Sequence, residues 1–305
     1  MTKILSSNKK IRRKKTEVKG TRWQLVRRQE FIETCLFWEG RINRRDLVDK
    51  FGISVPQATD DIAQYIKRAP SNIAYDAKEK AYLITATYKP EIIQPEADRY
   101  LMQLRAVHSG LTRSRDLYLN DLPSFDIVPI PRRPVKTEIL RQLLKAIRQR
   151  WAITITYQSM NSPRPAERDI SPHSIAFDGY RWHTRAYCHK DKIFKDFVIG
   201  RILKIGKHHR SIVDSYNDLA WNKILTAILV PNPKLPPAQQ MIIAMDYGME
   251  HGRLYMQLRA SFVYYFERLM GRYVMLGDNE SATQIEIENL SKLKSVADAL
   301  AHTRS

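Results

Sequence analysis

The first third of the chain places its hydrophobic residues at two spacings in turn, that of helices and then that of strands. Three successive segments, 22–39, 43–51 and 54–69, put their apolar residues on one side of a helix with 3.6 residues per turn. Asn43 and Ser54 are suitable N-caps, and SVPQ at the start of the third helix fits a capping box. Next, IAYDAKEKAYLIT contains two strand-like runs around a polar turn, which predicts a hairpin. Three helices followed by a hairpin are typical of a winged helix-turn-helix.

The middle of the chain changes from helical to strand periodicity. A helix and the proline-rich stretch PSFDIVPIPRRP predict a connector over 91–134, and an amphipathic helix follows over 135–150. From 151 to 208 the period becomes two, in short runs separated by NSPRP, DGY and HKDK, which predicts four or five strands with tight turns. Such an arrangement is typical of a small β-barrel of the Sm/SH3-like kind.

The last third predicts an α+β unit. MIIAMDYG and RLYMQLRAS are expected to form a hairpin around MEHG, followed by a helix, a strand and a closing helix, which is compatible with a ferredoxin-like unit. The whole chain is therefore expected to be a multidomain α+β protein. Its expected parts are a disordered basic arm over 1–20, a winged helix-turn-helix domain over 21–90, the helical connector over 91–134, the barrel domain over 135–210 and the α+β domain over 211–305.

The charge of the chain points to a polyanionic partner. The formal net charge is +19, and such an excess most often accompanies nucleic acid binding. Basic residues are dense between Lys3 and Arg28, where Glu17 is the single acid. Disordered basic arms commonly follow phosphates or enter a minor groove. The alternative is a basic protein whose charges are simply solvated.

The composition argues against several other classes of protein. No apolar run approaches the roughly 18 residues that a membrane span needs, and 1–17 lacks the apolar segment of a signal peptide. Cys35 and Cys188 lie far apart without CxxC spacing, which favours a reducing cytoplasm over disulfides or a zinc ribbon. GxSxG, GxGxxG and HExxH do not occur, and GRILKIGKH departs from a P-loop in its spacing. We therefore expect no enzymatic activity, no cofactor and no metal.

Two groups of polar residues in the first domain are expected to contact DNA. The third helix should enter the major groove, where Gln can pair with adenine and Asp can accept from cytosine. The expected base-contacting residues are Ser54, Pro56, Gln57, Thr59, Asp60 and Gln64. Two adjacent acids near phosphates are unfavourable, so Asp60 is weighted below Gln57 and Thr59. The expected phosphate-contacting residues, at the turn before the second helix, its start and the wing, are Arg41, Arg44, Arg45, Lys78 and Lys80.

The stretch RWHTRAYC predicts a strand with two different faces. One face carries Trp182, Thr184, Ala186 and Cys188 and can pack against a core. The other face carries Arg181, His183, Arg185 and Tyr187. This polar row is either a solvated or interface-forming surface or the lining of a site.

The same stretch resembles the WYL domain of bacterial transcriptional regulators. Residues 182–184, WHT, stand where that family typically has Trp-Tyr-Leu, and Phe197 and the pair Arg201–Ile202 match its downstream phenylalanine and arginine-isoleucine. RWHTRAYC is similar to the RWHxRA variant of the BrxR and CapW group, which regulates phage-defence islands, and the upstream SPH at 171–173 also fits. The resemblance covers nearly the whole chain. It implies a winged helix-turn-helix, a connector, a WYL barrel and a C-terminal dimerisation extension.

In that family the polar row lines a ligand pocket, and the resemblance implies one here. Arginine forks and aromatic faces suit an anion such as a nucleotide, a cyclic oligonucleotide or a short nucleic acid fragment. Arg185 is expected to have no internal partner until the anion binds. The implied ligand-binding residues are Tyr157, Ser171, His173, Trp182, His183, Arg185, Tyr187 and Arg201.

The resemblance implies a homodimeric transcriptional repressor in the cytoplasm. Such a protein binds double-stranded DNA at an inverted-repeat operator, responds to an anionic effector and controls a phage-defence operon. The alternative is an RNA-binding or single-strand nucleic-acid-binding accessory protein, because small barrels also bind single strands.

Overall fold

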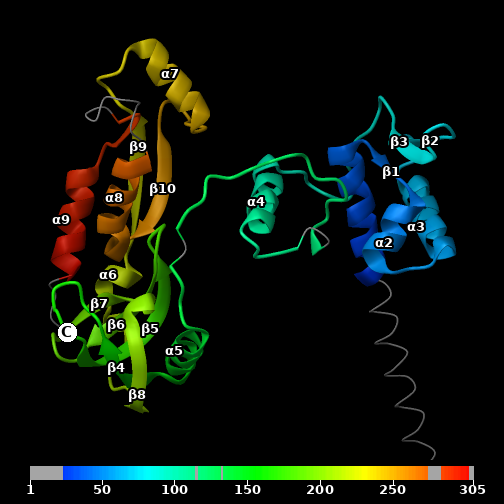
Figure 1. Ribbon diagram of the computed structural model, residues 1–305. Coiled ribbons are helices and arrows are strands. Elements are labelled where there is room, and N and C mark those ends of the chain that lie inside the picture. Colours follow the sequence, from blue (N-terminus) through cyan, green and yellow to red (C-terminus); the bar gives the residue numbers. More distant parts are fainter. Residues whose placement is uncertain (1–22, 114–115, 132, 274–282, 302–305) are drawn as a thin grey trace, which may run out of the picture. The chain divides into compact units, whose positions relative to one another are not determined.

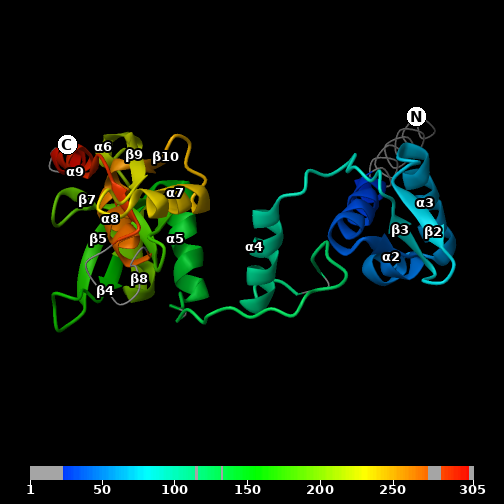
Figure 2. The ribbon, with the colours of Figure 1, turned by 90° about the horizontal axis from the view of Figure 1, so that it is seen from above.

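A computed structural model describes residues 23–113, 116–131, 133–273 and 283–301 (Figures 1 and 2). The chain divides into two compact units, Met1–Ile130 and Pro131–Ser305. The predicted basic arm over 1–20 lies outside the described residues. None of the helices in the described part of the chain combines the length and the apolar composition that a membrane span requires.

The described part of the N-terminal unit combines four α-helices with a small antiparallel sheet (Figure 1). Residues 23–39 form the first helix. The elements that follow are β1 (Arg41–Ile42), α2 (Arg44–Phe51), α3 (Val55–Arg68), β2 (Ile73–Asp76), β3 (Ala81–Ile84) and α4 (Ala97–His108). β3 lies between β1 and β2 in the sheet, and the apolar faces of the first three helices form one core around Phe31, Leu47 and Ile62. The predicted three helices and hairpin are confirmed, while β1 is an addition to them.

Side-chain caps set the starts of α2 and α3. Asn43 accepts the N–H of Asp46 at 3.1 Å and donates its own N–H to the Asp46 carboxylate at 2.7 Å, so α2 has a complete capping box. Ser54 accepts the N–H of Gln57 at 3.3 Å. The Gln57 side chain, however, turns to Asp61 instead of returning to Ser54. The predicted capping box of α3 is therefore only half formed.

The first half of the C-terminal unit is a five-stranded antiparallel sheet in the order β7-β6-β5-β4-β8, covered by one helix. Its elements are α5 (Thr137–Gln149), β4 (Trp151–Tyr157), β5 (Ala166–Phe177), β6 (Trp182–Cys188), β7 (Ile193–Val198), the 3₁₀ turn η2 (Ile199–Arg201) and β8 (Ile202–Arg210). The outer strands β7 and β8 are consecutive in the chain, joined by η2. Both strands are fully described, and they are not paired with each other through backbone hydrogen bonds. A closed Sm/SH3-like barrel is therefore not confirmed and stays a prediction.

The second half of this unit is a three-stranded sheet in the order β10-β9-β11 with helices packed on it. Its elements are α6 (Leu219–Asn222), β9 (Ile224–Pro231), α7 (Pro237–Asp246), β10 (Leu254–Arg259), the 3₁₀ turn η4 (Ala260–Phe262), α8 (Val263–Tyr273), β11 (Ile285–Ile287) and α9 (Leu290–Ala301). Val263 of α8 and Leu293 of α9 share an apolar cluster with Ala227 of β9, and Figure 1 shows both helices beside this sheet.

One sequence prediction in this sheet is wrong. MIIAMDYG does not pair with β10 in a hairpin but belongs largely to helix α7, and the partner of β10 is β9, a strand that was not predicted. Strands and helices therefore alternate from β9 to α9. This order replaces the expected one of hairpin, helix, strand and helix. A proline in the first turn of α7 and the alanine, glutamines and methionines around it favour a helix over the strand preference of the two isoleucines.

Candidate functional site

The exposed side of α3 carries most of the predicted base-contacting residues. Those that are exposed are Ser54, Pro56, Asp60 and Gln64. Thr59 is half-buried and donates its hydroxyl to the Val55 carbonyl at 2.9 Å. The opposite side of the helix is buried through Ala58, Ile62 and Tyr65. The core therefore fixes which side of α3 faces solvent.

Gln57 is held by a buried ion pair beneath α3. Its Nε2 donates to Asp61 Oδ1 at 3.1 Å. Asp61 is fully buried and accepts from Arg28 Nε at 2.5 Å and Nη2 at 3.2 Å, while Gln29 donates to its backbone carbonyl. One N–H and the carbonyl oxygen of the Gln57 amide remain available, which is the donor and acceptor pair that adenine requires. Because Asp61 is neutralised inside the domain, only Asp60 of the two adjacent acids faces solvent.

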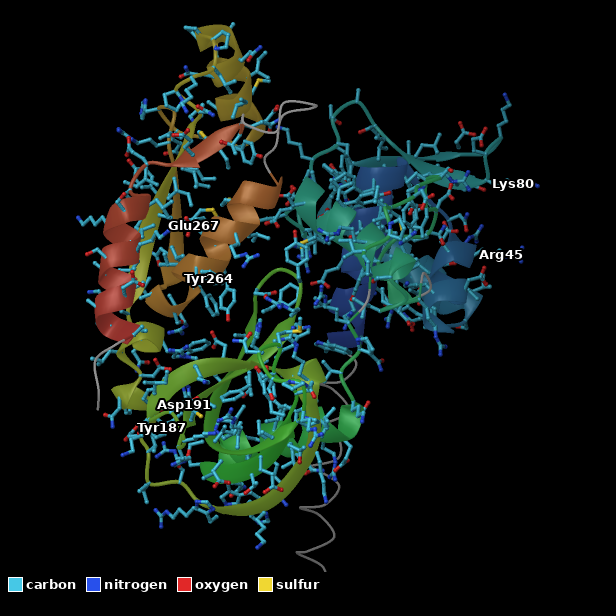
Figure 3. All side chains as sticks on the ribbon, turned by 60° about the vertical axis from the view of Figure 1, so that its left-hand side comes forward. Arg45, Lys80, Tyr187, Asp191, Tyr264 and Glu267 are labelled. Atoms are coloured by element: carbon cyan, nitrogen blue, oxygen red, sulfur yellow. The ribbon has the colours of Figure 1, made fainter. Side chains whose placement is uncertain are left out.

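The predicted phosphate-contacting residues are all exposed. Arg41 lies in the short strand β1, paired with Leu83, rather than in a turn. Arg45, in the first turn of α2, has its Nε 3.5 Å from Asp49, an exposed pair of little energetic weight. Figure 3 shows the side chains of Arg45 and Lys80 pointing outward from α2 and from the wing.

Sequence reasoning missed two exposed residues in this region. Lys67 is exposed in the last turn of α3, and its spacing from Asp60 and Gln64 places it on the same helix side. Tyr75 is exposed on β2 and packs edge-on against Tyr82. Continuing the i, i+4, i+7 series along the third helix identifies Lys67, whereas the exposure of Tyr75 depends on which side of the hairpin the domain covers.

Two members of the polar row of RWHTRAYC, His183 and Arg185, are buried, whereas Arg181 and Tyr187 are half-buried. Arg185 donates from Nε and Nη2 to the two oxygens of Asp218 at 2.8 and 3.0 Å, and its Nη1 lies 3.5 Å from Asp196. Asp218, the N-cap of α6, also accepts from His173 Nε2 at 3.0 Å. Burial raises the pKa of Asp218, but hydrogen bonds from His173 and Arg185 outweigh it and lower the pKa to about 2. The expectation that Arg185 has no internal partner is therefore wrong.

His183 lies in the same row, at 2% exposure. Its Nε2 is 3.7 Å from Asp178, its ring faces that of Tyr265 with centroids 5.3 Å apart, and its Nδ1 has no hydrogen-bond partner among the described residues. Burial lowers the pKa of His183, against the opposite effect of Asp178 and Asp196, so the ring is neutral at pH 7. Tyr265 of α8 donates its hydroxyl to Asp196 at 3.0 Å. The row thus joins the five-stranded sheet to α6 and α8.

Two aromatic members of the predicted ligand set lie away from this row. Trp182, expected on the core side of β6, is 50% exposed and packs at a tilt against Phe177, with ring centroids 4.8 Å apart. Tyr157 packs edge-on against Phe197 in the sheet's apolar core at 5.2 Å. The ring partners of Trp182 and Tyr157 are therefore phenylalanines rather than the buried His183 and Arg185.

Tyr187 and Arg201 are the remaining members, and both are half-buried. Tyr187 contacts Phe194 edge-on at 5.2 Å. Figure 3 labels it together with Asp191, which lies in the turn between β6 and β7. Arg201 ends η2, and its charge contributes to the lowered pKa of His183.

Ser171 and His173 lie in the wall of a separate pocket of about 320 Å³. His183, Arg185 and Arg201 do not line it, but Arg150 and Arg210 do. The structure therefore places His183 and Arg185 in the buried row and Ser171 and His173 at the pocket, while Tyr157 and Trp182 belong to neither. Sequence reasoning missed both pocket arginines, because one ends a helix and the other ends a strand 60 residues later in the chain.

Comparison with protein families divides the chain into three matched segments. Residues 24–106 match the winged helix-turn-helix domain of the BrxR transcriptional regulator. Residues 138–206 match the WYL domain. Residues 224–293 match the C-terminal dimerization domain of the BrxR transcriptional regulator.

Relatives with assigned names resemble the chain over most of its length. A protein of Stenotrophomonas maltophilia named DNA-binding transcriptional repressor CapW is 37% identical over 290 residues, which is 93% of this chain and 97% of that protein. Proteins of the same name from Escherichia coli strain KTE188 and Pseudomonas aeruginosa are 38% and 40% identical, each covering 81% of this chain and 82% of the relative.

Proposed function

Because the chain belongs to the family of CapW DNA-binding transcriptional repressors, we propose that it is a homodimeric repressor of an inverted-repeat operator. The family is one of regulators rather than enzymes, and the chain has its winged helix, WYL and dimerisation domains. Two winged domains related by a twofold axis match two half-sites about one helical turn apart. A phage-defence operon is the proposed target.

One observation carries the proposal. α3 begins with an exposed, side-chain-capped turn and presents polar residues along one side, while basic residues of α2 and the wing flank it. Base contacts in the major groove supply specificity, and phosphate contacts supply position and affinity. The proposed base contacts come from Gln57 and Thr59, and the proposed phosphate contacts from Arg44, Arg45 and Lys80.

Replacing Gln57 tests the base-contacting role. Gln57→Ala should weaken binding to the cognate duplex by about 1–3 kcal/mol and change binding to random duplex little. Gln103→Ala on α4 is the control, because that glutamine lies on neither α3 nor the hairpin. DNA fragments selected by the purified protein supply the cognate sequence, and fluorescence anisotropy measures the affinities. Equal losses on cognate and random DNA would rule out base recognition by Gln57.

The same measurement separates the repressor from an RNA-binding or single-strand-binding accessory protein. A repressor should bind the selected duplex far more tightly than single-stranded RNA of equal length at the same salt concentration. Tighter binding to the single strand would favour the accessory protein. Mapping the selected fragments to genomic positions tests whether the target is a phage-defence operon.

Regulation by an effector in the WYL domain is the second part of the proposal. It is supported by the pocket beside Ser171 and His173 and by the route from His173 through Asp218 to α6. An effector changes DNA affinity only by its difference in affinity for the two states of the dimer. Measuring operator affinity with and without a bound effector tests this part.

A further inference from the structure

The pocket beside Ser171 lies where four segments of the C-terminal unit meet. The end of α5, the middle of β5, the end of β8 and the following segment 211–215 form its walls. Its volume of about 320 Å³ falls at the lower end of the range for small-molecule sites, roughly 300–1,000 Å³. A molecule of mononucleotide size therefore suits it better than a polymer.

Two arginines line this pocket, one just after the end of α5 and the other at the end of β8. Arg150 follows α5 in a left-handed conformation, with φ 52°, and its carbonyl accepts the N–H of Ser211 at 3.0 Å. Arg210 ends β8 opposite Trp151 of β4. The pairing of β4 with β8 thus fixes both backbones side by side. Both arginines are exposed, and among the ion pairs of the described residues none involves either guanidinium.

The rest of the wall is compatible with an anion that carries an organic group. Ser211 donates its hydroxyl to Ser171 at 2.7 Å, so two neutral groups are part of the lining. Asp214, the carboxylate among the lining residues, is exposed and accepts the N–H of Tyr216 at 3.0 Å, and with two arginines the lining is still cationic. The apolar lining consists of Ile147, Pro172, Phe194, Ile212 and Val213. One side of the pocket is therefore cationic and another apolar and aromatic.

We propose that this pocket binds a small phosphorylated molecule of about mononucleotide size, with its phosphate on Arg150 and Arg210. A phosphorylated molecule would be the ligand class of the effector site, and in that respect the inference rests on the proposed function. Guanidinium forks bind phosphate through paired charge-assisted hydrogen bonds. Arg185 is not the anion-binding arginine, because Asp218 and Asp196 already occupy its guanidinium.

The position of the pocket links its occupancy to the C-terminal sheet. Segment 211–215 is one wall of the pocket and leads directly to Asp218, the N-cap of α6. His173, another lining residue, donates to Asp218 at 3.0 Å. A phosphate held between Arg210 and Arg150 restrains the start of this segment, so binding favours one arrangement of the chain entering the C-terminal sheet.

Calorimetric titration of the full-length protein with three probes tests the proposal. The probes are adenosine 5′-monophosphate, inorganic pyrophosphate and adenosine, at a fixed ionic strength of about 0.15 M because exposed charges are screened by salt. Both phosphate-bearing probes should bind, and adenosine should not. Arg150→Asn and Arg210→Ala should each weaken binding about tenfold or more. Asparagine is chosen at position 150 because it tolerates the left-handed conformation.

Arg148→Ala is the matched control. It removes one exposed charge from the same end of α5 but from outside this pocket, so binding should stay within about twofold of the unsubstituted protein. Thermal melts establish that each variant is folded. A higher affinity for the nucleotide than for pyrophosphate would indicate that the nucleoside contacts the apolar wall. Equal affinities would support the phosphate subsite alone.

Three results would overturn the proposal. They are no binding of either phosphate-bearing probe up to about 10 mM, equal losses in Arg148→Ala and the pocket variants, and adenosine binding as tightly as the nucleotide. Operator binding is measured on the same samples. Its failure in the unsubstituted protein counts against the repressor and leaves the titration result valid, because the pocket lies within the C-terminal unit.

Discussion

Asp218 joins three separate segments of the C-terminal unit through one carboxylate. It is 1% exposed and accepts from His173 on β5, Arg185 on β6 and the N–H of Trp221 in α6. Asp218→Asn retains a helix cap but removes the charge that neutralises Arg185. We expect a loss of about 3–5 kcal/mol in the free energy of unfolding, because a buried guanidinium loses its main partner.

Denaturant unfolding measures this loss, and Asp191→Asn is its control. Asp191 pairs with Lys195, but both side chains are partly exposed, so its replacement should cost less than about 1 kcal/mol. Similar losses in the two variants would show that the Asp218 pair contributes no more than a surface pair.

His183 gives stability a dependence on pH in the weakly acidic range. Its pKa is lowered by burial from the ordinary value of 6.5, so the unfolded chain binds a proton at a higher pH than the folded one. The free energy of unfolding should therefore decrease as the pH falls below 6.5, until the folded histidine also protonates. Unfolding curves between pH 8 and pH 5 measure this decrease. His183→Gln should lessen the slope, and an unchanged slope would contradict the assignment.

At the scale of elements, the first helix holds the start of the connector through Glu33. This carboxylate is fully buried and accepts the N–H groups of Glu91, Ile92 and Ile93 as well as the hydroxyl of Tyr65. Glu33→Gln places an amide donor against backbone donors. We expect a loss of about 3 kcal/mol in unfolding free energy and faster hydrogen exchange at 91–93.

Glu30→Gln, one turn earlier in the same helix, is the control for Glu33. Its replacement should change stability by less than about 0.5 kcal/mol. Protection of 91–93 that survives in Glu33→Gln would mean that other contacts hold the connector in place.

Elements with a clear period could be predicted from the sequence, and elements with competing signals could not. The apolar stripes and caps of α2 and α3 and the alternation in β6 each indicate one structure. α7 gives conflicting signals, because isoleucines favour a strand while the proline at its start favours a helix. β9, with the sequence ILTAILVP, is a short apolar run without alternation, and such a run does not distinguish a strand from a helix.

The candidate sites were predictable only where their residues lie close in sequence. The exposed side of α3 follows from helical spacing alone. Arg185 and Asp218 are separated by 33 positions, and no local pattern pairs them. Asp61 did leave a signal, because an acid beside Ala58 and Ile62 on the buried side of a helix requires an internal partner. Identifying that partner as Arg28 needed the packing of the first helix.

At the scale of the whole molecule, its charge should set how DNA binding depends on salt. Arg44 and Arg45 are exposed at the start of α2, and each phosphate contact contributes about one unit to the slope of log affinity against log salt. Their joint replacement by alanine should weaken binding to all duplexes alike and lower the slope by about two units. The control is Arg141→Ala with Arg148→Ala on α5. An unchanged slope in the Arg44 and Arg45 variant would contradict the phosphate contacts.

Dimerisation should depend on α7, which exposes an apolar side within the segment that matches a dimerization domain. Met241 and Met245 are each 74% exposed and one helical turn apart, with Ile242 beside them at 55%. Exposed apolar groups gathered on one helix side favour a protein interface, and the matched family makes a second copy the expected partner.

Met241→Glu with Met245→Glu should therefore give a folded monomer in sedimentation equilibrium. It should bind a single half-site normally but lose the added affinity for the inverted repeat, because the two domains are no longer linked. Met160→Glu, at a methionine of similar exposure (77%) outside this segment, should remain dimeric. A dimer that persists in the α7 variant would place the interface elsewhere.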